Sequence, residues 1–218
     1  MKVISIVNTK GGVGKSTLTC NLAVAAAQDN KNVLIIDGDG KQASSLAFRA
    51  LREKDDITAI SITTPTINKD IKKFSDFDII FIDVGGRDST ISRSAIMAAA
   101  EGLLLIPVLP SNYDIWATED TFKLLGEARA FIDIKAYAVF NQVLPNTNIK
   151  IVKEAKLALE EMSLEYNVPL LDQYLYSRVD YKSSVGEGKG VIEYNSKSKA
   201  ALEVINLYEE IKLKLKEN

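Results

Sequence analysis

The sequence predicts an α/β fold in which a mostly parallel, twisted sheet carries helices on both faces. Two observations lead to this expectation. Short β-rich segments alternate along the chain with longer segments of helical periodicity, as in successive βαβ units. The β-rich segments are nearly continuous in apolar residues, which is typical of strands covered on both sides. A chain of 218 residues suffices for one substantial core, so we expect a single domain over residues 1–218.

Five strands and five long helices are expected in alternation. The strands cover residues 2–8, 32–38, 77–84, 102–108 and 134–142. The helices cover Ser16–Asp29, Ser89–Ala100, Asp114–Phe131, Ile149–Tyr166 and Ser198–Lys216, the last with a clear apolar stripe. Residues 177–200 contain three glycines and five basic residues, and we expect an irregular surface segment there.

The composition excludes several functional classes. The chain has no histidine, which removes His-based catalysis, and its single cysteine, Cys20, allows neither an internal disulfide nor a four-cysteine metal site. No apolar run approaches the length of a membrane-spanning helix, and the first apolar run is too short for a secretory signal. We therefore expect a cytoplasmic protein. The net charge of −2 gives no global sign of nucleic-acid binding.

The segment "NTKGGVGKST", residues 8–17, predicts a phosphate-binding loop. It follows an apolar strand and precedes a helix, so its backbone N–H groups and the helix dipole can both face phosphate oxygens. In this arrangement Lys15 contacts the β- and γ-phosphates and the Ser16 hydroxyl ligates Mg²⁺. Thr9 occupies the position of the usual first glycine, and a second lysine, Lys10, follows it. The complete set of expected nucleotide contacts in the loop is Lys10, Gly11, Gly12, Val13, Gly14, Lys15, Ser16 and Thr17.

The "KGGVGKST" portion of this loop resembles the deviant Walker A sequence of ParA/MinD-family ATPases, and the resemblance extends from residue 1 to about 205. It implies a P-loop NTPase-like fold and a slow, partner-stimulated, Mg²⁺-dependent ATPase that uses ATP. It also implies a nucleotide-sandwich homodimer in which Lys10 reaches the phosphates bound by the other subunit, while Lys15 serves its own nucleotide. An electron-transfer role like that of the nitrogenase iron protein needs two cysteines per subunit, and the chain has one.

Acidic residues at the ends of the second and third expected strands complete the predicted site. "VLIIDGDGKQASS" carries Asp37 and Asp39 where ligands bind in open α/β sheets. The family pattern there is D-x-D-P-Q, which assigns water positioning to Asp39 and Mg²⁺ and switch organisation to Asp37. Gly40 and Lys41 replace the family's proline and glutamine. Asp83, which ends "FDIIFID", has the form of a Walker B aspartate, and we expect it to hold Mg²⁺ through a water, because this ion keeps several of its waters.

Three further segments resemble family elements. The Gly-Gly pair in "VGGRDS" is placed beside the γ-phosphate, and its Arg87 is expected to make structural rather than catalytic contacts. "LLLIPVLPSNYD" resembles a strand that ends in P-x-x-P-S-x-x-D and contributes to the dimer and switch face. Asn141, after the last expected strand, corresponds to an asparagine that contacts the adenine edge.

Partition of plasmid or chromosomal DNA is the function that the resemblance favours. The sequence begins at its first strand, so an N-terminal helix-turn-helix domain is not expected. Nonspecific binding to double-stranded DNA, and hence association with the nucleoid, is assigned to a basic cluster that a dimer would double. A ParB-like centromere-binding protein is the expected partner. The residues of this cluster are Arg178, Lys182, Lys189, Lys197 and Lys199.

The alternative is a MinD-like ATPase that positions cell machinery at the membrane. Such proteins end in a short basic amphipathic helix that inserts into the bilayer surface. The terminal "EEIKLKLKEN" alternates lysine with leucine, but it continues the apolar stripe of a helix long enough to pack on the sheet, and it has no aromatic anchor. We therefore expect no membrane binding.

Overall fold

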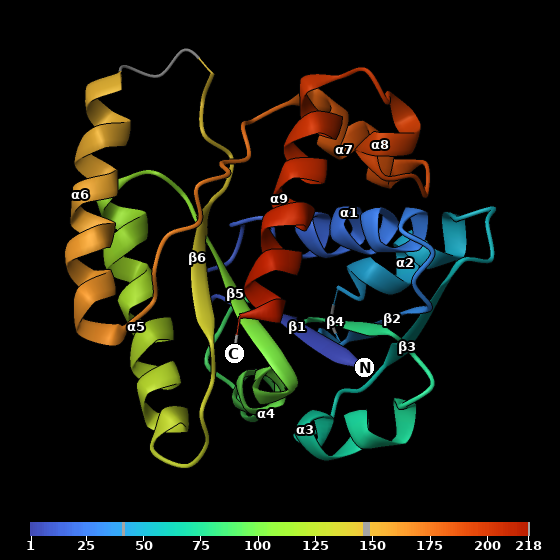
Figure 1. The fold of residues 1–218 in the computed structure, drawn as a ribbon, viewed down its shortest axis with the longest axis horizontal. Coiled ribbons are helices and arrows are strands. Elements are labelled where there is room, and N and C mark those ends of the chain that lie inside the picture. The colour runs from blue at the N-terminus through green and yellow to red at the C-terminus, as the bar shows by residue number, and fades with distance from the viewer. Residues whose placement is uncertain (41, 146–148, 218) are drawn as a thin grey trace.

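A computed structural model describes residues 1–40, 42–145 and 149–217. Its sheet has six strands, all parallel, in the order β3-β2-β4-β1-β5-β6. The strands are β1 (Lys2–Ile6), β2 (Val33–Asp37), β3 (Ile57–Ser61), β4 (Ile79–Asp83), β5 (Gly102–Val108) and β6 (Ala136–Phe140). This architecture confirms the fold class expected from the alternation of apolar and helical segments (Figure 1).

Helices cover both faces of the sheet, and each face has its own apolar core. One group consists of α1 (Lys15–Gln28), α2 (Ser44–Leu51), α7 (Val179–Gly186), α8 (Val191–Tyr194) and α9 (Lys199–Lys216). The other consists of α3 (Ile67–Asp70), α4 (Thr90–Ala98), α5 (Asn112–Arg129) and α6 (Ile149–Tyr166), with the 3₁₀ turns η1 (Ile71–Phe74) and η2 (Ala99–Glu101). In Figure 1, α1 and α7–α9 lie above the sheet, and α3 and α4 lie below it.

Alternate residues of each inner strand enter opposite cores. In β2, Val33 and Ile35 pack with α1 and α9, whereas Leu34 and Ile36 pack on the other face. The same alternation in β4 places Asp83 on the α1 side, because strand side chains have a period of two. The two cores explain why these strands read as continuous apolar runs.

The strand order places the carboxyl ends of β1 and β4 at a switch point of the sheet. After β1 the chain crosses to β2 on one side, and after β4 it crosses to β5 on the other. Loops that leave in opposite directions open a crevice between them, and this is where open α/β sheets bind ligands. The predicted phosphate loop follows β1 and therefore borders this crevice.

The structure also contains elements that the sequence analysis did not anticipate. Strand β3 and helix α2 were missed because both are short and β3 is a half-buried edge strand beside a run of charges. The prediction of an irregular segment over residues 177–200 is wrong, because α7 and α8 form there. They are held by buried contacts rather than by helical periodicity: Gly190 lies against Val24 of α1, and Val191 N donates to Asn21 Oδ1 at 2.8 Å.

Candidate nucleotide-binding site

The phosphate loop connects β1 directly to α1 and takes its shape from two glycines. Gly12 and Gly14 have φ values of 79° and 88°, a region in which a β-carbon is strained. A β-carbon on Gly14 would also lie 2.4 Å from Asn141 Nδ2. Lys15 Nζ donates to the carbonyl of Lys10 at 3.0 Å, which folds the lysine side chain back over the loop.

A cavity of about 750 Å³ opens over this loop at the carboxyl edge of the sheet. Its volume lies in the range of small-molecule sites. Lys15 is almost buried, and burial lowers its pKa while the nearby Asp83 and Asp39 act in the opposite direction. Phosphate oxygens bound in this cavity would lie beside the Lys15 amino group, the loop amides and the N-terminus of α1. Its walls include Gly11, Lys15, Ser16, Thr17, Asp39 and Gly85.

A smaller cavity of about 100 Å³ adjoins the first, and the two share Gly14, Thr17, Gln142 and Lys182. Its remaining walls are largely apolar or aromatic, which suits a planar base next to a polyphosphate. They include Leu18, Leu175, Tyr176 and Tyr181.

Asn141 and Gln142 connect the end of β6 to the phosphate loop. Asn141 Nδ2 donates to Val13 O at 2.7 Å, and Gln142 Nε2 donates to Gly12 O at 2.9 Å. Asn141 Oδ1 accepts from the backbone N–H of Gln142. Asn141 thus positions the loop in this structure, and one amide hydrogen remains for the contact with a base that the sequence predicts.

Asp37 and Asp83 are direct neighbours, paired across β2 and β4. Both carboxylate oxygens of Asp37 accept hydrogen bonds from the backbone: Oδ1 from Asp39 N, and Oδ2 from Ser45 N at 3.0 Å and from Leu46 N. Burial raises the pKa of Asp37, and these amide bonds oppose that rise. Of the two roles expected for Asp37, this geometry favours organising the Asp39 turn and the start of α2 over direct metal ligation.

Asp83 has the properties of a metal ligand. Its Oδ2 accepts from Ser45 Oγ at 2.7 Å, whereas Oδ1 is buried and has no hydrogen-bond partner among the described residues. Burial raises the pKa of Asp83 to about 6, and the hydroxyls of Ser45 and Ser16 counteract it. A cation beside Oδ1 would satisfy this orphaned oxygen. Asp83 and the Ser16 hydroxyl therefore fit the Mg²⁺ that a nucleotide would bring with its own oxygens and waters.

Asp39 lies on the opposite wall of the cavity from α1. Its Oδ1 accepts from the backbone N–H of Gln42 at 3.3 Å, and its Oδ2 lies close to Gly85, where a β-carbon would approach it to 3.2 Å. The next glycine, Gly86, contacts the loop so closely that a β-carbon would lie 2.7 Å from Gly11 Cα. The Gly-Gly pair therefore brings the Asp39 carboxylate next to the phosphate loop. Lys41, which replaces the family's glutamine, lies outside the described residues.

Lys10 lies outside the cavity and points to α5. Its ammonium group forms an ion pair with the Asp114 carboxylate, which also accepts from the Ser111 hydroxyl. The backbone before it is fixed to the same helix, because Thr9 N donates to Thr121 Oγ1 at 2.9 Å. Thr9 Oγ1 also lies within hydrogen-bond distance of Thr121 Oγ1, at 3.1 Å, a side-chain contact that a glycine at this position could not make. The two lysines of the loop thus face different directions.

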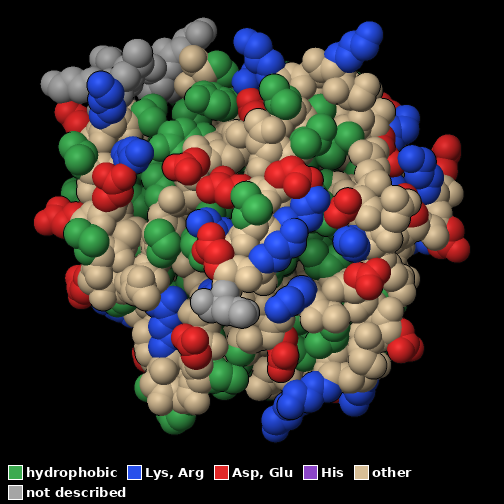
Figure 2. Space-filling view, viewed as in Figure 1, with side chains coloured by type: hydrophobic (Ala, Val, Ile, Leu, Met, Phe, Trp, Pro, Cys, Tyr) green, Lys and Arg blue, Asp and Glu red, His purple; other side chains and the backbone are tan. Residues whose placement is uncertain are grey.

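The five residues predicted to bind DNA lie in different surroundings. The Arg178 guanidinium pairs with Glu203 at 2.5 Å and lies over the Tyr176 ring in the wall of the smaller cavity. Lys182 lines both cavities. Lys189 pairs with Glu187, and Lys197 and Lys199 are exposed. Figure 2 shows basic and acidic side chains interspersed over the visible face, without a field of one sign.

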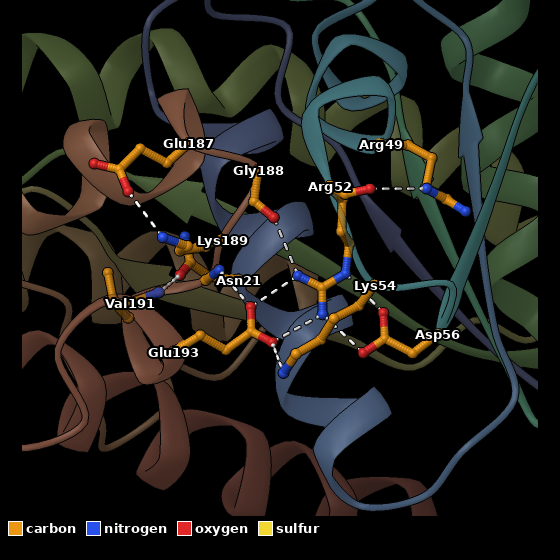
Figure 3. Close-up of polar contacts among 11 residues, drawn as sticks. Asn21, Arg49, Arg52, Lys54, Asp56, Glu187, Gly188, Lys189, Val191 and Glu193 are labelled. Carbon is orange, nitrogen blue, oxygen red and sulfur yellow. Dashed lines mark hydrogen bonds and ion pairs between the residues drawn. The ribbon is translucent and has the colours of Figure 1, made fainter.

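A buried charge cluster fastens the α7–α8 segment to the end of α2 (Figure 3). Arg52 is almost fully buried and donates to Asp56, to Glu193 and, at 3.1 Å, to Gly188 O. Burial alone would raise the pKa of Glu193, but its bonds to Arg52 and Lys54 hold it at about 2. The first turn of α2 is bound to Asp37 through the backbone N–H groups of Ser45 and Leu46, and the other end of this helix is therefore coupled to α7 and α8.

Comparison with known proteins decides the family. A sequence profile of the CobQ/CobB/MinD/ParA nucleotide binding domain matches residues 4–191. The chain belongs to this family. It is 31% identical to the Protein ParA of Rhizobium radiobacter over 182 residues, which cover 81% of each chain. It is 26% identical over 208 residues to the Maintenance of carboxysome distribution protein A of Halothiobacillus neapolitanus, covering 93% of this chain and 92% of that one.

A solved structure confirms the fold of this ParA/MinD-family ATPase. The septum site-determining protein MinD from Pyrococcus horikoshii, complexed with Mg-ADP, superposes with a TM-score of 0.78 at 21% identity, covering 96% of this chain and 95% of that one. ATP hydrolysis as a general activity follows from the family. That related protein holds a magnesium nucleotide, the class of ligand for which the geometry around Lys15, Ser16 and Asp83 is suited.

Two residues of the site were not predicted there: Ser45 was not singled out, and Lys182 was expected to bind DNA. Ser45 joins Asp37 to Asp83 through its amide and hydroxyl, and Lys182 reaches the nucleotide cavity from α7. Both lie on elements that the sequence analysis missed. Among the described residues, no group of three or more His, Cys, Asp or Glu side chains is arranged so that it could hold a metal ion.

Proposed function

We propose that this ATPase binds Mg·ATP, closes into a nucleotide-sandwich homodimer, and in that state binds DNA without sequence preference to partition plasmid or chromosomal cargo with a ParB-like partner. Hydrolysis is slow, and the partner accelerates it. The observation that carries the proposal is the opposite orientation of the two loop lysines. Lys15 lies in its own cavity, whereas Lys10 is held on α5 at the surface and is available to a second subunit.

Within each half-site the residues have separate roles. Lys15, the loop amides and the α1 N-terminus bind the phosphates. Ser16 and Asp83 hold the metal, which offsets charge on the phosphoryl oxygens when bound. Asp39 orients the attacking water, and Asp37 keeps the Asp39 turn in place through its backbone bonds. The partner's copy of Lys10 completes the charge around the phosphates, so that hydrolysis requires the dimer.

The DNA-binding surface is assigned to Lys189, Lys197 and Lys199, because Arg178 and Lys182 belong to the cavity walls. A dimer presents two copies of this surface. With about three phosphate contacts per copy, log affinity plotted against log salt should have a slope of about −5, and the monomer should show half of it. DNA binding should therefore require ATP and a dimer at physiological salt. Such ATP-dependent DNA binding would place the protein on the nucleoid.

The membrane alternative receives less support from α9. Leu207 and Ile211 of its apolar stripe are fully buried, and Leu213 is the large apolar side chain left exposed in its last turn. A helix whose apolar face already packs on the sheet has little left to insert into a bilayer. Within the part of the chain that the structure describes, no helix is long and apolar enough to span a membrane.

A charge-reversal experiment tests the proposal. Lys189, Lys197 and Lys199 are replaced together by glutamate, and DNA binding is measured with ATP at increasing salt. The matched control replaces Lys69, Lys72 and Lys73 by glutamate; these lysines lie in and just after α3, on the opposite face of the sheet. Each set of three includes one lysine in a surface ion pair, Lys73 with Asp70 and Lys189 with Glu187. We expect the first variant to lose DNA binding while it still binds ATP, and the control to retain both.

Two outcomes would contradict the proposal. Equal DNA binding by both variants would show that Lys189, Lys197 and Lys199 do not contribute to the DNA-binding surface. An ATP-bound protein that ignores DNA at low salt but sediments with vesicles of anionic phospholipid, and loses this when residues 209–218 are deleted, would establish the membrane function instead.

A further inference from the structure

We propose that Tyr113 and Trp116 form an aromatic contact in the interface between two copies of this chain, and that ATP buries them. This inference rests on the proposed dimer. The two rings stand on the first turns of α5 in a T-shaped arrangement with centroids 5.5 Å apart. Their exposed fractions are 79% and 60%. Tryptophan is seldom so exposed unless it serves recognition, and aromatic side chains dominate binding energy at protein interfaces.

The position of the pair follows from Lys10. Asp114, which holds the Lys10 ammonium group, lies between Tyr113 and Trp116 on the same helix. One helical turn rises about 5.4 Å, so both rings lie within about one turn of this ion pair. A second copy whose phosphates come within reach of Lys10 must approach the start of α5. Tyr113 and Trp116 are three residues apart and therefore neighbours on the exposed side of α5, so a copy seated there comes within reach of both rings.

The face around the pair is suited to meet a copy of itself. A hollow of about 550 Å³ lies beside Lys10 and α5, and Ala117 and Leu124 form part of its apolar wall. An interface with two-fold symmetry uses the same patch on both subunits, so it needs a protrusion and a hollow on one face. Three basic and three acidic residues line the hollow, so two copies of this face would not repel each other by net charge. They are Lys10, Arg93, Lys123, Asp88, Asp120 and Glu127.

Trp116 is the only tryptophan of the chain, which makes the test direct. Its emission is recorded with ADP and with ATP and Mg²⁺, with excitation at the red edge of its absorption, where nucleotides do not absorb. Light scattering on the same samples reports the mass. The Asp39→Ala background is used so that ATP is not consumed. We expect a blue shift and a loss of quenching by iodide that follow the formation of the dimer.

Substitutions measure the energetic contribution. Trp116→Ala should raise the dimer dissociation constant by about 30-fold, and Trp116→Phe should recover part of that loss. Phe131, 84% exposed just beyond the far end of α5, provides the matched control, because Phe131→Ala removes an exposed aromatic ring away from Lys10. That control should dimerise like the parent. All three variants should bind ATP as monomers, since neither position lines the nucleotide cavities.

The failure of this inference is distinguishable from failure of the proposed function. A dimer that forms with ATP while Trp116 keeps its emission and its quenching would overturn the inference and leave the ATPase cycle intact. Equal dissociation constants for Trp116→Ala and Phe131→Ala would also overturn it. If scattering shows only monomer with ATP at high protein concentration, the sandwich dimer itself is wrong.

Discussion

The ammonium group of Lys10 forms an ion pair with the carboxylate of Asp114, and this contact joins the phosphate loop to the first turn of α5. In the dimer that we propose, Lys10 must leave Asp114 to reach the other subunit's phosphates. The ion pair therefore acts against dimerisation. Asp114→Asn should lower the dimer dissociation constant by about tenfold, since each subunit contributes one partly exposed pair. Analytical ultracentrifugation with ATP would measure it, and a weaker dimer would show that Asp114 instead serves the interface.

Removal of Lys10 has the opposite expected effect. Lys10→Ala should bind ATP as well as the parent does, because Lys15 and not Lys10 lines the cavity, but it should not dimerise. Mixing it with a Lys15 variant tests the geometry, because such a heterodimer keeps one half-site intact. Recovery of hydrolysis in the mixture is expected. A Lys10→Ala protein that dimerises normally with ATP would contradict a role across the interface.

Lys15 should determine nucleotide affinity. Lys15→Gln removes a charge-assisted contact to phosphate, and calorimetry should show affinity for ATP lower by about two orders of magnitude. The fold should persist, because burial already disfavours the charge of Lys15, as its lowered pKa shows. Circular dichroism controls for folding. Retained micromolar binding would exclude this loop as the phosphate site.

Asp39 should affect hydrolysis and leave binding unchanged. Its carboxylate lies near the phosphate loop through the Gly85–Gly86 turn, and orientation of water acts on the transition state rather than on bound ATP. Asp39→Ala should hydrolyse ATP about two orders of magnitude more slowly and accumulate as an ATP-bound dimer in size-exclusion chromatography. If Asp39→Ala hydrolysed ATP at the parental rate, a group other than Asp39 would orient the attacking water.

Asp83 is expected to destabilise the nucleotide-free protein. Its pKa is raised to about 6 from the usual 3.8, so the folded state binds its proton more tightly than the unfolded state does. Stability therefore falls as pH rises through about 4 to 6, and the penalty is complete above pH 6. Asp83→Asn should raise the free energy of unfolding at pH 7, in chelator, by on the order of 1–3 kcal/mol, and by less at pH 5. Mg²⁺-dependent hydrolysis should be lost. If Asp83→Asn instead destabilised the protein at pH 7, Asp83 Oδ1 could not be a buried oxygen without a hydrogen-bond partner.

The Arg52–Glu193 pair should stabilise the attachment of α7 and α8. Glu193→Gln removes one of the two carboxylates that pair with the buried Arg52, and we expect the free energy of unfolding in urea at pH 7 to fall by about 2–4 kcal/mol. Because the pKa of Glu193 is depressed from 4.5 to about 2, its contribution is full above pH 4.5 and disappears as pH falls toward 2. Glu187→Gln, which removes an exposed pair with Lys189, is the control and should change little.

The sequence by itself determined the fold class, the phosphate loop and the acidic strand ends. These features are local or periodic: apolar runs covered on both faces, glycines at positive φ before a helix, and aspartates at residues 37 and 83 where strands stop. Each can be recognised within a few residues, because backbone geometry and strand periodicity impose them directly.

The tertiary structure alone decided how the remaining polar groups pair. The ion pair between Arg178 and Glu203, 25 residues later, and the bond from Asn141 Nδ2 to Val13 O in the phosphate loop are both visible only in the folded protein. Asp114 pairs with Lys10 because α5 packs against the loop that follows β1, where Thr9 N donates to Thr121 Oγ1. Such pairings join residues far apart in the chain, and their energies depend on burial and distance. No local sequence pattern specifies these pairings, because they form only when the helices pack on the sheet.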